Sequence, residues 1–287
     1  MTGGPGGVEV ALDAGAELGE GPTWDPATGT LVWVDILASA VHRTDPGTGR
    51  DTTRDTAQHV GAAKPDTAGG LVVNLVEGVG RYGQGDGDFR WLARWPEDGV
   101  RGNDAAVDPW GRLWAGTMRY DEDPGGGRLR RLDPDGTVAV VLDAVTISNG
   151  LGWSPDLRRM YYIDTPTRRV DVFDVDAGGD VRGRRPFAAV EAGSPDGLCV
   201  DADGAVWVAL WDGGAIHRYT PDGRLDRALP LPVSRPTACT FGGPDLRDLY
   251  VTTARVGLAA PEPHAGALLV VPGAGQGLPP TAFRFSS

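Results

Sequence analysis

Four polar side chains stand at the start of similar short segments that are spread over the chain. The segments are EGPTWD, NDAAVD, NGLGWS and DGLCVD, and they begin at Glu20, Asn103, Asn149 and Asp196. In each, a large apolar residue follows four positions later and Asp or Ser five positions later. Carboxylate and amide oxygens suit hard divalent cations such as Ca²⁺, Mg²⁺ and Mn²⁺. Asp or Asn before Gly also starts ordinary turns, so this chemistry depends on whether the fold brings the four side chains together.

The same segments are the beginnings of a repeat. Each leads through a turn (DPATG, DPWG, SPDL, DADG) into an apolar strand (LVWVD, LWAG, MYYID, VWVAL), and a further strand such as AVHRTD or RLRRLD follows. Two weaker copies begin at Gly61 and Thr237. The six units therefore start near residues 20, 61, 103, 149, 196 and 237, which are 41, 42, 46, 47 and 41 residues apart. Six such units of three or four short strands are typical of a β-propeller.

We predict an all-β protein, a six-bladed β-propeller with four-stranded antiparallel blades around a central channel. The 44 Gly and 23 Pro, scattered among short apolar runs, favour strands and turns over helices. A β-sandwich does not explain so regular a repeat, and the end units do not look like the caps of a solenoid. No linker separates the units, so residues 1–287 are expected to form one domain. Residues 8–13 and the tail near Ala282–Phe285 are expected to pair in one blade and close the ring.

A propeller makes the starts of the six units converge. Each start precedes the strongest turn-and-strand signal and is expected on the innermost strand, so equivalent positions face one another across the channel. Around the ring these positions are Glu20, Gly61, Asn103, Asn149, Asp196 and Thr237. Two carboxylates in a narrow channel repel each other and lose hydration, so they require a cation or protons. No His or Cys falls at these positions, which argues against a structural tetrahedral zinc site but leaves Zn²⁺ at an open, oxygen-rich site as an option.

Five segments in order resemble one known family. They are GEGPTWDPATGTLVWVDI, RGNDAAVDPWGRLWAGTM, SNGLGWSPD followed by MYYIDT, SPDGLCVDADGAVWVAL, and RPTACTFGG followed by LYVTTAR. The chain resembles the SMP-30/regucalcin/gluconolactonase family of six-bladed propellers from about Leu18 to Leu258. The resemblance implies a lactonase that depends on a divalent metal and opens sugar lactones, such as gluconolactone, to aldonic acids.

The resemblance also implies the metal site and its base. The ligands would be Glu20 of GEGP, Asn149 of SNGL and Asp196 of PDGL, which are three of the ring residues. One divalent ion, Ca²⁺, Mg²⁺, Mn²⁺ or Zn²⁺, would keep open positions for water and for a lactone oxygen. It would polarise the carbonyl and lower the pKa of its water, and Asp196 would accept the proton as that water attacks.

Substrate contacts follow from two further motifs. Arg101 and Asn103 of RGND are implied to bind sugar oxygens, since a guanidinium supplies a fork of donors and an amide offers both a donor and an acceptor. An acidic residue shortly after AGTM is implied as a third contact. We assign it to Asp121, with Glu122 and Asp123 as competitors in the same loop.

In this region, Gly102 departs from the family pattern, and Asp104 has two possible roles. Gly102 stands where members more often carry a bulky residue, which implies a more open pocket wall. Asp104 follows Asn103 and either hydrogen-bonds a turn or contacts a water or second ion; we favour the turn.

Two other functions use the same features. The metal and base would also serve a promiscuous hydrolase of other esters or organophosphates, and a calcium-binding propeller without turnover is an alternative from another class. A scaffold has no need of carboxylates and amides in its channel, and calcium storage has no need of Arg101 beside Asn103. Sugar-lactone hydrolysis is therefore the leading prediction, with a small-molecule sugar lactone as the partner.

Composition excludes some partners. The formal net charge of −12 argues against nucleic acid and against an anionic membrane surface. No run of 18 apolar residues is present, and the start MTGGPGGVEVALDAG lacks the basic flank and apolar stretch of a signal peptide. A monomeric, cytoplasmic protein is expected.

Overall fold

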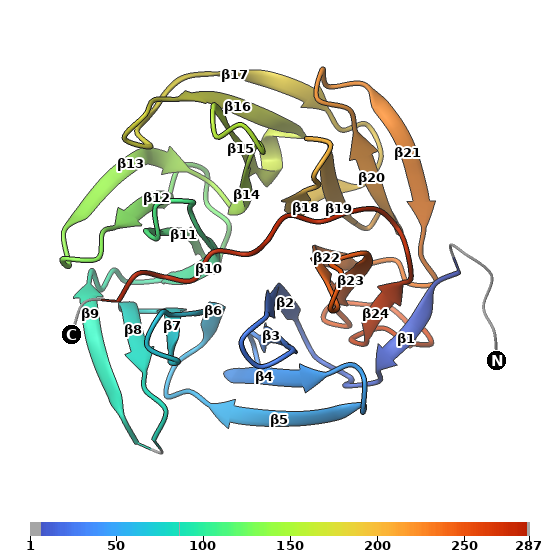
Figure 1. The fold of residues 1–287 in the computed structure, drawn as a ribbon, viewed down its shortest axis with the longest axis horizontal. Coiled ribbons are helices and arrows are strands. Elements are labelled where there is room, and N and C mark those ends of the chain that lie inside the picture. Colours follow the sequence, from blue (N-terminus) through green and yellow to red (C-terminus); the bar gives the residue numbers. More distant parts are fainter. Residues whose placement is uncertain (1–6, 86, 286–287) are drawn as a thin grey trace.

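Six four-stranded antiparallel sheets form the blades of a ring in the computed structural model of the protein (Figure 1). The structure describes residues 7–85 and 87–285. The predicted six-bladed β-propeller is confirmed. The one helical element in these two ranges is the 3₁₀ turn η1 (Thr165–Thr167), and no helix there is long and apolar enough to cross a membrane.

The first five blades each consist of four consecutive strands that pair in chain order. Blade 1 contains β2 (Gly19–Asp25), β3 (Thr30–Asp35), β4 (Ala40–Asp45) and β5 (Arg50–Asp55). Blade 2 contains β6 (Val60–Pro65), β7 (Leu71–Leu75), β8 (Gly78–Tyr82) and β9 (Phe89–Arg94). Blade 3 contains β10 (Val100–Val107), β11 (Leu113–Arg119), β12 (Gly127–Leu132) and β13 (Val138–Val145).

The last three blades follow the same plan, with one exception. Blade 4 contains β14 (Ser148–Trp153), β15 (Arg159–Asp164), β16 (Arg169–Val175) and β17 (Val181–Ala189). Blade 5 contains β18 (Ser194–Val200), β19 (Val206–Trp211), β20 (Ala215–Tyr219) and β21 (Leu225–Pro230). Blade 6 contains β22 (Pro236–Gly242), β23 (Asp248–Thr253), β24 (Leu268–Val271) and the N-terminal strand β1 (Glu9–Leu12).

The innermost strands β2, β6, β10, β14, β18 and β22 surround the central axis, each in contact with its neighbours (Figure 1). All six repeat starts lie on these strands. Burial decreases outward: β3 and β7 are buried almost throughout, whereas β5 and β21 are mostly exposed. Because adjacent blades cover both faces of the inner strands, those strands are apolar on both sides, and the outer strands are polar.

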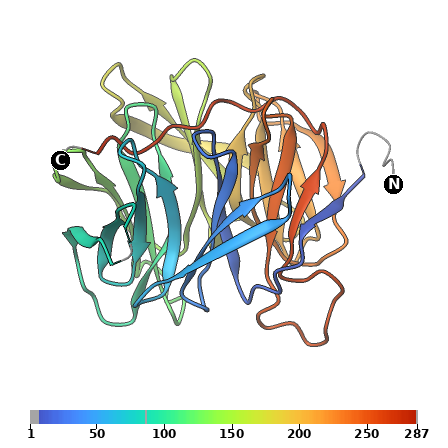
Figure 2. The ribbon, with the colours of Figure 1, turned by 60° about the horizontal axis from the view of Figure 1, so that its bottom comes forward.

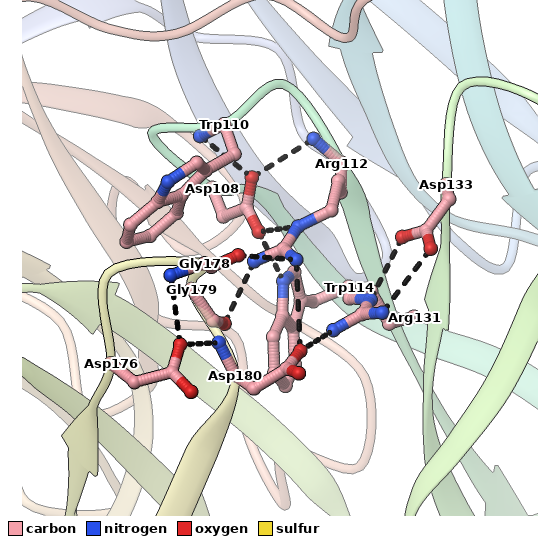
Figure 3. A network of polar contacts seen from close by, with 10 residues as sticks. All are labelled: Asp108, Trp110, Arg112, Trp114, Arg131, Asp133, Asp176, Gly178, Gly179 and Asp180. Carbon is pink, nitrogen blue, oxygen red and sulfur yellow. Dashed lines mark hydrogen bonds and ion pairs between the residues drawn. The ribbon is translucent and has the colours of Figure 1, made fainter.

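An aspartate at the fifth repeat position folds the turn after the innermost strand. In blade 3, one carboxylate oxygen of Asp108 accepts the backbone N–H groups of Trp110 and Arg112, both at 2.9 Å. The other oxygen accepts Nε of Arg112 at 2.6 Å and the indole N–H of Trp114 at 2.9 Å (Figure 3). Arg112 Nη2 then donates to the carbonyl of Gly179 in blade 4 at 2.7 Å. One carboxylate thus fixes a turn, a core tryptophan and a contact between blades.

Equivalent residues act in the same way elsewhere. Asp25, Asp66 and Asp201 each accept backbone N–H groups of their own turn and pair with an arginine of the same blade. In blade 4 the place is taken by Ser154, whose hydroxyl accepts the N–H of Arg159 at 3.0 Å. The Asp or Ser that marks the repeat in the sequence is therefore a turn-former.

Both ends of the chain contribute to closure, but in different places. β1 pairs with β24 and completes blade 6, as expected for residues 8–13. The expected pairing of Ala282–Phe285 in that same blade is wrong. Phe283 instead forms a parallel bridge with Asp66, and its N–H donates to the carbonyl of Pro65 in blade 2 at 2.9 Å.

The segment 274–285, which we call the strap, crosses one face of the ring (Figure 1). The N–H of Ala202 in blade 5 donates to Gln276 O at 2.8 Å, and the N–H of Arg284 donates to Gly111 O in blade 3, also at 2.8 Å. Figure 2 shows the strap on one face, while the loop between β23 and β24 projects from the other. The strap therefore ties blades on opposite sides of the channel together and leaves the other face open.

Candidate functional site

A cavity of about 560 Å³ opens at the start of the innermost strands, at the end of the channel away from the strap. Five of the six predicted site residues line it: Glu20, Arg101, Asn103, Asn149 and Asp196. They come from β2, β10, β14 and β18, which are far apart in the sequence. At the other end of the channel, a smaller cavity of about 200 Å³ is lined partly by strap residues 278–281.

Strand register explains which further residues reach this cavity. The first residue of an innermost strand pairs with the last residue of the second strand, as Ser194 pairs with Trp211 and Val100 with Arg119. The loops that follow the second strands therefore surround the same opening. They supply Glu122, a competitor already named in the sequence analysis, and lining residues that the sequence analysis missed: Tyr120, Thr165, Trp211, Asp212, Val256 and Gly257. The signal was present, because each lies at or just past the end of a recognised strand.

A relay of hydrogen bonds fixes the amide side chains across three blades. Arg101 Nη1 donates to Asn103 Oδ1 at 2.7 Å. Asn103 Nδ2 donates to Asn149 Oδ1 at 2.6 Å, and Asn149 Nδ2 donates to Thr165 Oγ1 at 2.7 Å. Thr165 in turn donates to Pro195 O, beside Asp196, at 2.8 Å. Each amide thus has a defined orientation, and the predicted substrate-binding and metal-binding residues form one connected unit.

The carboxylates of Glu20 and Asp196 are buried and accept few hydrogen bonds. Glu20 is 6% exposed and accepts one hydrogen bond, from the N–H of Gly21 at 2.9 Å. Asp196 is also 6% exposed, and no hydrogen bond to its carboxylate is formed within the described residues. Burial raises the pKa of Glu20 to about 8, with the charge of Asp104 adding to the effect. Burial also raises the pKa of Asp196 well above its usual range, and Glu20 and Asp104 raise it further.

These side chains fit a divalent ion. Two buried carboxylates with free oxygens and an oriented amide, Glu20, Asp196 and Asn149, form an oxygen-only donor set of the kind that Ca²⁺, Mg²⁺ and Mn²⁺ prefer. No group of three His, Cys, Asp or Glu suited to a metal occurs in the described part of the chain, so an ion here would depend on the amide.

Asp121 does not reach the cavity. Its carboxylate forms two hydrogen bonds with Arg119, at 2.8 Å each, on the exposed side of the loop, which lowers the pKa of Asp121 to about 2. Glu122, the next residue, lines the cavity instead and has a positive φ of 57°. Of the competing acidic residues in this loop, the structure therefore brings Glu122 to the site.

Gly102 does not widen the cavity. A Cβ at this position would lie 2.7 Å from Leu75 O and 2.8 Å from Asn74 O, both in blade 2. The missing side chain lets blades 2 and 3 approach, and Asn74 Nδ2 donates to Asn103 O at 2.9 Å across the gap. The expectation of a more open wall is wrong, because successive residues of a strand point to opposite sides.

Asp104 is a buried residue of an innermost strand. It does not form the turn that the sequence analysis favoured. It lies on β10 and accepts the N–H of Ala105 at 2.7 Å. Burial raises the pKa of Asp104, and the charge of Lys64, a buried residue of β6, opposes this rise. The sequence analysis did not single out Lys64.

The rim is held by interactions between blades. His59 Nδ1 and Tyr120 Oη are 2.8 Å apart and join blades 2 and 3. The guanidinium of Arg235 lies 4.8 Å from the ring centroid of Trp211 and donates to Asp212 at 2.7 Å and to Val256 O. These contacts give the loops around the opening a fixed shape.

Fold and site together define a class of protein: a six-bladed propeller with an acidic, oxygen-lined cavity at one mouth of its channel. The chain belongs to the SMP-30/gluconolactonase/LRE-like family, whose model matches residues 18–255. The family resemblance predicted from the sequence is confirmed.

Curated relatives and solved structures agree with this assignment. The chain is 38% identical to 6-deoxy-6-sulfogluconolactonase from Pseudomonas putida over 85% of this chain and 86% of that protein. It is 40% identical to a pentonolactonase from Haloferax volcanii over 86% and 85% of the two chains. A calcium-binding protein, regucalcin, from Agrobacterium tumefaciens superposes with a TM-score of 0.93 at 29% identity, over 98% of each chain.

Proposed function

We propose that this protein hydrolyses a sugar lactone to the open-chain aldonic acid in the cavity that opens away from the strap. The observation that carries the proposal is the pair Glu20 and Asp196, two buried carboxylates with free oxygens, set beside the oriented polar groups of Arg101, Asn103 and Asn149. The lactonase names of two relatives support the reaction class. One divalent ion held by Glu20, Asn149 and Asp196 completes the proposal, and the calcium-binding relative supports it.

A bound divalent ion would supply Lewis-acid polarisation and lower the pKa of nearby water. The protein's own residues do the rest. Asp196 accepts a proton from the water whose oxygen attacks the carbonyl carbon of the lactone. Its carboxylate has no hydrogen-bond partner in the described residues, so one oxygen can bind the ion while the other accepts the proton. When the ring C–O bond breaks, Asp196 returns the proton to the departing ring oxygen.

Arg101 and Asn103 position the substrate. Arg101 uses Nη1 to hold Asn103 and Gly102 O, while its other N–H groups have no hydrogen-bond partner in the described residues. Those donors are available to sugar oxygens. Glu122 replaces Asp121 as the acidic contact, since a carboxylate that lines the cavity can accept hydrogen bonds from sugar hydroxyls. The many donors and acceptors around the cavity suit a polyhydroxylated substrate.

Acid release from a panel of aldonolactones tests the proposal. The metal-free protein is assayed alone and after addition of Ca²⁺, Mg²⁺, Mn²⁺ or Zn²⁺, with Asp196→Asn beside the wild type. We expect metal-dependent turnover that falls by about 10²–10⁴ in Asp196→Asn, the usual effect of removing a general base. Asp212→Asn is the matched control, because Asp212 lines the same cavity but pairs with Arg235 at its rim.

Each alternative has its own result. Metal binding without turnover of any lactone would favour a calcium-binding propeller. Turnover of simple esters or organophosphates in preference to every lactone would favour the promiscuous hydrolase. Full lactonase activity in Asp196→Asn would refute the role given to this residue.

A further inference from the structure

The chain has two cysteines, Cys199 and Cys239, and they meet at one contact between blades 5 and 6. Cys199 lies on β18 and Cys239 on β22, the innermost strands of these blades. Both are free thiols, their Sγ atoms are 3.6 Å apart, and they are 40 positions apart in the sequence. The fold therefore brings together two thiols that local sequence keeps far apart.

The repeat places these two side chains opposite each other. Cys199 stands three residues past the repeat start of its blade, and Cys239 two residues past that of the next blade. The same two positions meet between blades 4 and 5, where a Cβ on Gly152 would lie 3.0 Å from Leu198 Cδ1. The contact is thus a regular feature of neighbouring blades, and at the boundary of blades 5 and 6 both partners are cysteines.

The two thiols lie at the end of the channel toward the strap, away from the site proposed for lactone hydrolysis. Both cysteines line the smaller cavity of about 200 Å³, and Lys64 is the charged residue of its described lining. Cys199 is half-buried, whereas Cys239 is 3% exposed and its Sγ donates to Trp207 O at 3.7 Å. A cavity of this size holds several water-sized molecules. It therefore admits hydrogen peroxide but not a bulky disulfide such as oxidised glutathione.

The apolar surroundings favour a neutral product at this site over a charged one. Cys239 belongs to a buried cluster with Trp207 and Phe241, and Cys199 packs against that cluster. The hydrogen bond with Cys239 and burial raise the pKa of the Cys199 thiol well above its usual range, and the charge of Asp201 adds to the rise. A metal ion would require ionised sulfurs, whereas a disulfide carries no charge. Oxidation should be slow at neutral pH, because the thiolate is the reactive form.

We propose that Cys199 and Cys239 form an oxidation site, at which a small peroxide joins blades 5 and 6 by a disulfide. The Cys199 thiolate attacks one oxygen of hydrogen peroxide, the O–O bond breaks and hydroxide leaves, so that Cys199 becomes a sulfenic acid. The sulfur of Cys239 then attacks that of Cys199. The S–S bond forms as the S–O bond breaks, and the hydroxide leaves with the thiol proton as water. In total, two thiols and one hydrogen peroxide give one disulfide and two waters.

The disulfide would brace the ring at the blade where the chain closes it. Blade 6 is completed by β1 from the start of the chain, which pairs with β24 by hydrogen bonds alone. A bond between residues 40 positions apart would tie the innermost strand of this blade to that of blade 5. Such a bond stabilises the folded state mainly by restricting the unfolded chain.

Peroxide treatment of the folded wild type tests the proposal. The protein is reduced, freed of reductant and treated with hydrogen peroxide at neutral and at alkaline pH. We expect the free thiols, counted after denaturation, to fall from two per chain to none, and a peptide map to show Cys199 joined to Cys239. Thiol loss should be faster at alkaline pH, by up to about tenfold per pH unit. The oxidised protein should unfold at roughly 1 M more urea than the reduced protein.

Several results would overturn the inference. Thiols that survive an excess of peroxide would do so, as would oxygen added to Cys199 without the cross-link, because Cys239 would then not be placed to react. A disulfide that joins two copies of the chain would refute a site within one propeller. A cross-link that forms only in urea would assign the reaction to the unfolded chain and refute it as well.

Cys239→Ser is the matched variant for the brace. Its hydroxyl keeps a donor for Trp207 O but cannot form a disulfide. Peroxide should leave Cys199 of this variant as a sulfenic acid, which dimedone traps, and should not raise the urea midpoint. An equal rise of the midpoint in wild type and variant would show that the disulfide is not its cause and would refute the brace.

Discussion

Glu20 should make the metal-free protein less stable as pH rises. Burial raises its pKa from 4.5 to about 8 in the folded chain. The unfolded chain therefore loses this proton near pH 4.5, while the folded chain keeps it until about pH 8. Between these values the folded state binds one more proton, so the free energy of unfolding decreases by up to about 1.4 kcal/mol per pH unit. Over the whole window of about 3.5 units, the loss is on the order of 5 kcal/mol.

Urea denaturation in the presence of a chelator measures this effect at intervals from about pH 5 to about pH 8. We expect the wild type to lose stability across the range. Glu20→Gln cannot ionise, so its stability curve should be flatter than that of the wild type. Glu17→Gln is the matched control, since Glu17 is exposed and lies only three residues before Glu20 in the sequence. A wild-type stability that rises over this range, or an unchanged slope in Glu20→Gln, would refute the reasoning.

A bound divalent ion should counteract the loss of stability at high pH that Glu20 causes in the metal-free protein. Metal binds the ionised carboxylate, so it competes with the proton that burial retains on Glu20. Below about pH 8, the affinity for Ca²⁺ should therefore rise by about tenfold per pH unit for each proton displaced. Saturating Ca²⁺ should in turn remove most of the loss of stability toward high pH. Calorimetry at two pH values checks this, and an affinity independent of pH would contradict it.

Three further predictions concern the turn, the strap and the acidic loop. Asp201→Ala leaves buried N–H groups and an arginine without their acceptor and should cost about 3–5 kcal/mol in urea denaturation, whereas the exposed Asp203→Ala should change little. Phe283→Ala should cost about 3–5 kcal/mol by opening a cavity under the strap, without changing the metal affinity. Glu122→Gln should raise the KM for a lactone about tenfold, and Asp121→Asn should not; the reverse order would favour Asp121 as the contact.

The propeller could be predicted because the residues that recur in each unit stabilise a local structure, the turn after the innermost strand. Asp108 and Asp201 each bind the N–H groups of their own turn, so the same residue type must recur wherever that turn recurs. The place of the strap could not be predicted in this way. Phe283 meets blade 2 across about three quarters of the chain, and the segment around it, PPTAFRF, belongs to no repeat unit that would indicate which surface it covers.

The part of the candidate site that lies on the innermost strands could be predicted. Glu20, Asn149 and Asp196 occupy equivalent repeat positions, so knowing the fold places them in one cavity. The loop after β11 follows no such rule, because its conformation depends on local pairing. Arg119 captures Asp121 on the outside, and the positive φ of Glu122 brings that residue to the cavity instead.

Lys64 lies between these two cases. The composition alone draws attention to it, since Lys64 is the single lysine of a chain whose other basic residues, apart from histidine, are arginines. The composition does not say why, because Lys64 lies three residues past the repeat position and its partners Gly21 and Thr23 belong to another blade. The packing of β6 against β2 and β10 brings its ammonium close enough to feel the charges of two carboxylates, Asp104 and Glu20. A residue that departs from the composition of its own chain is therefore a reason to look at its neighbours, and here the charge of Lys64 acts on Glu20, one of the proposed metal ligands.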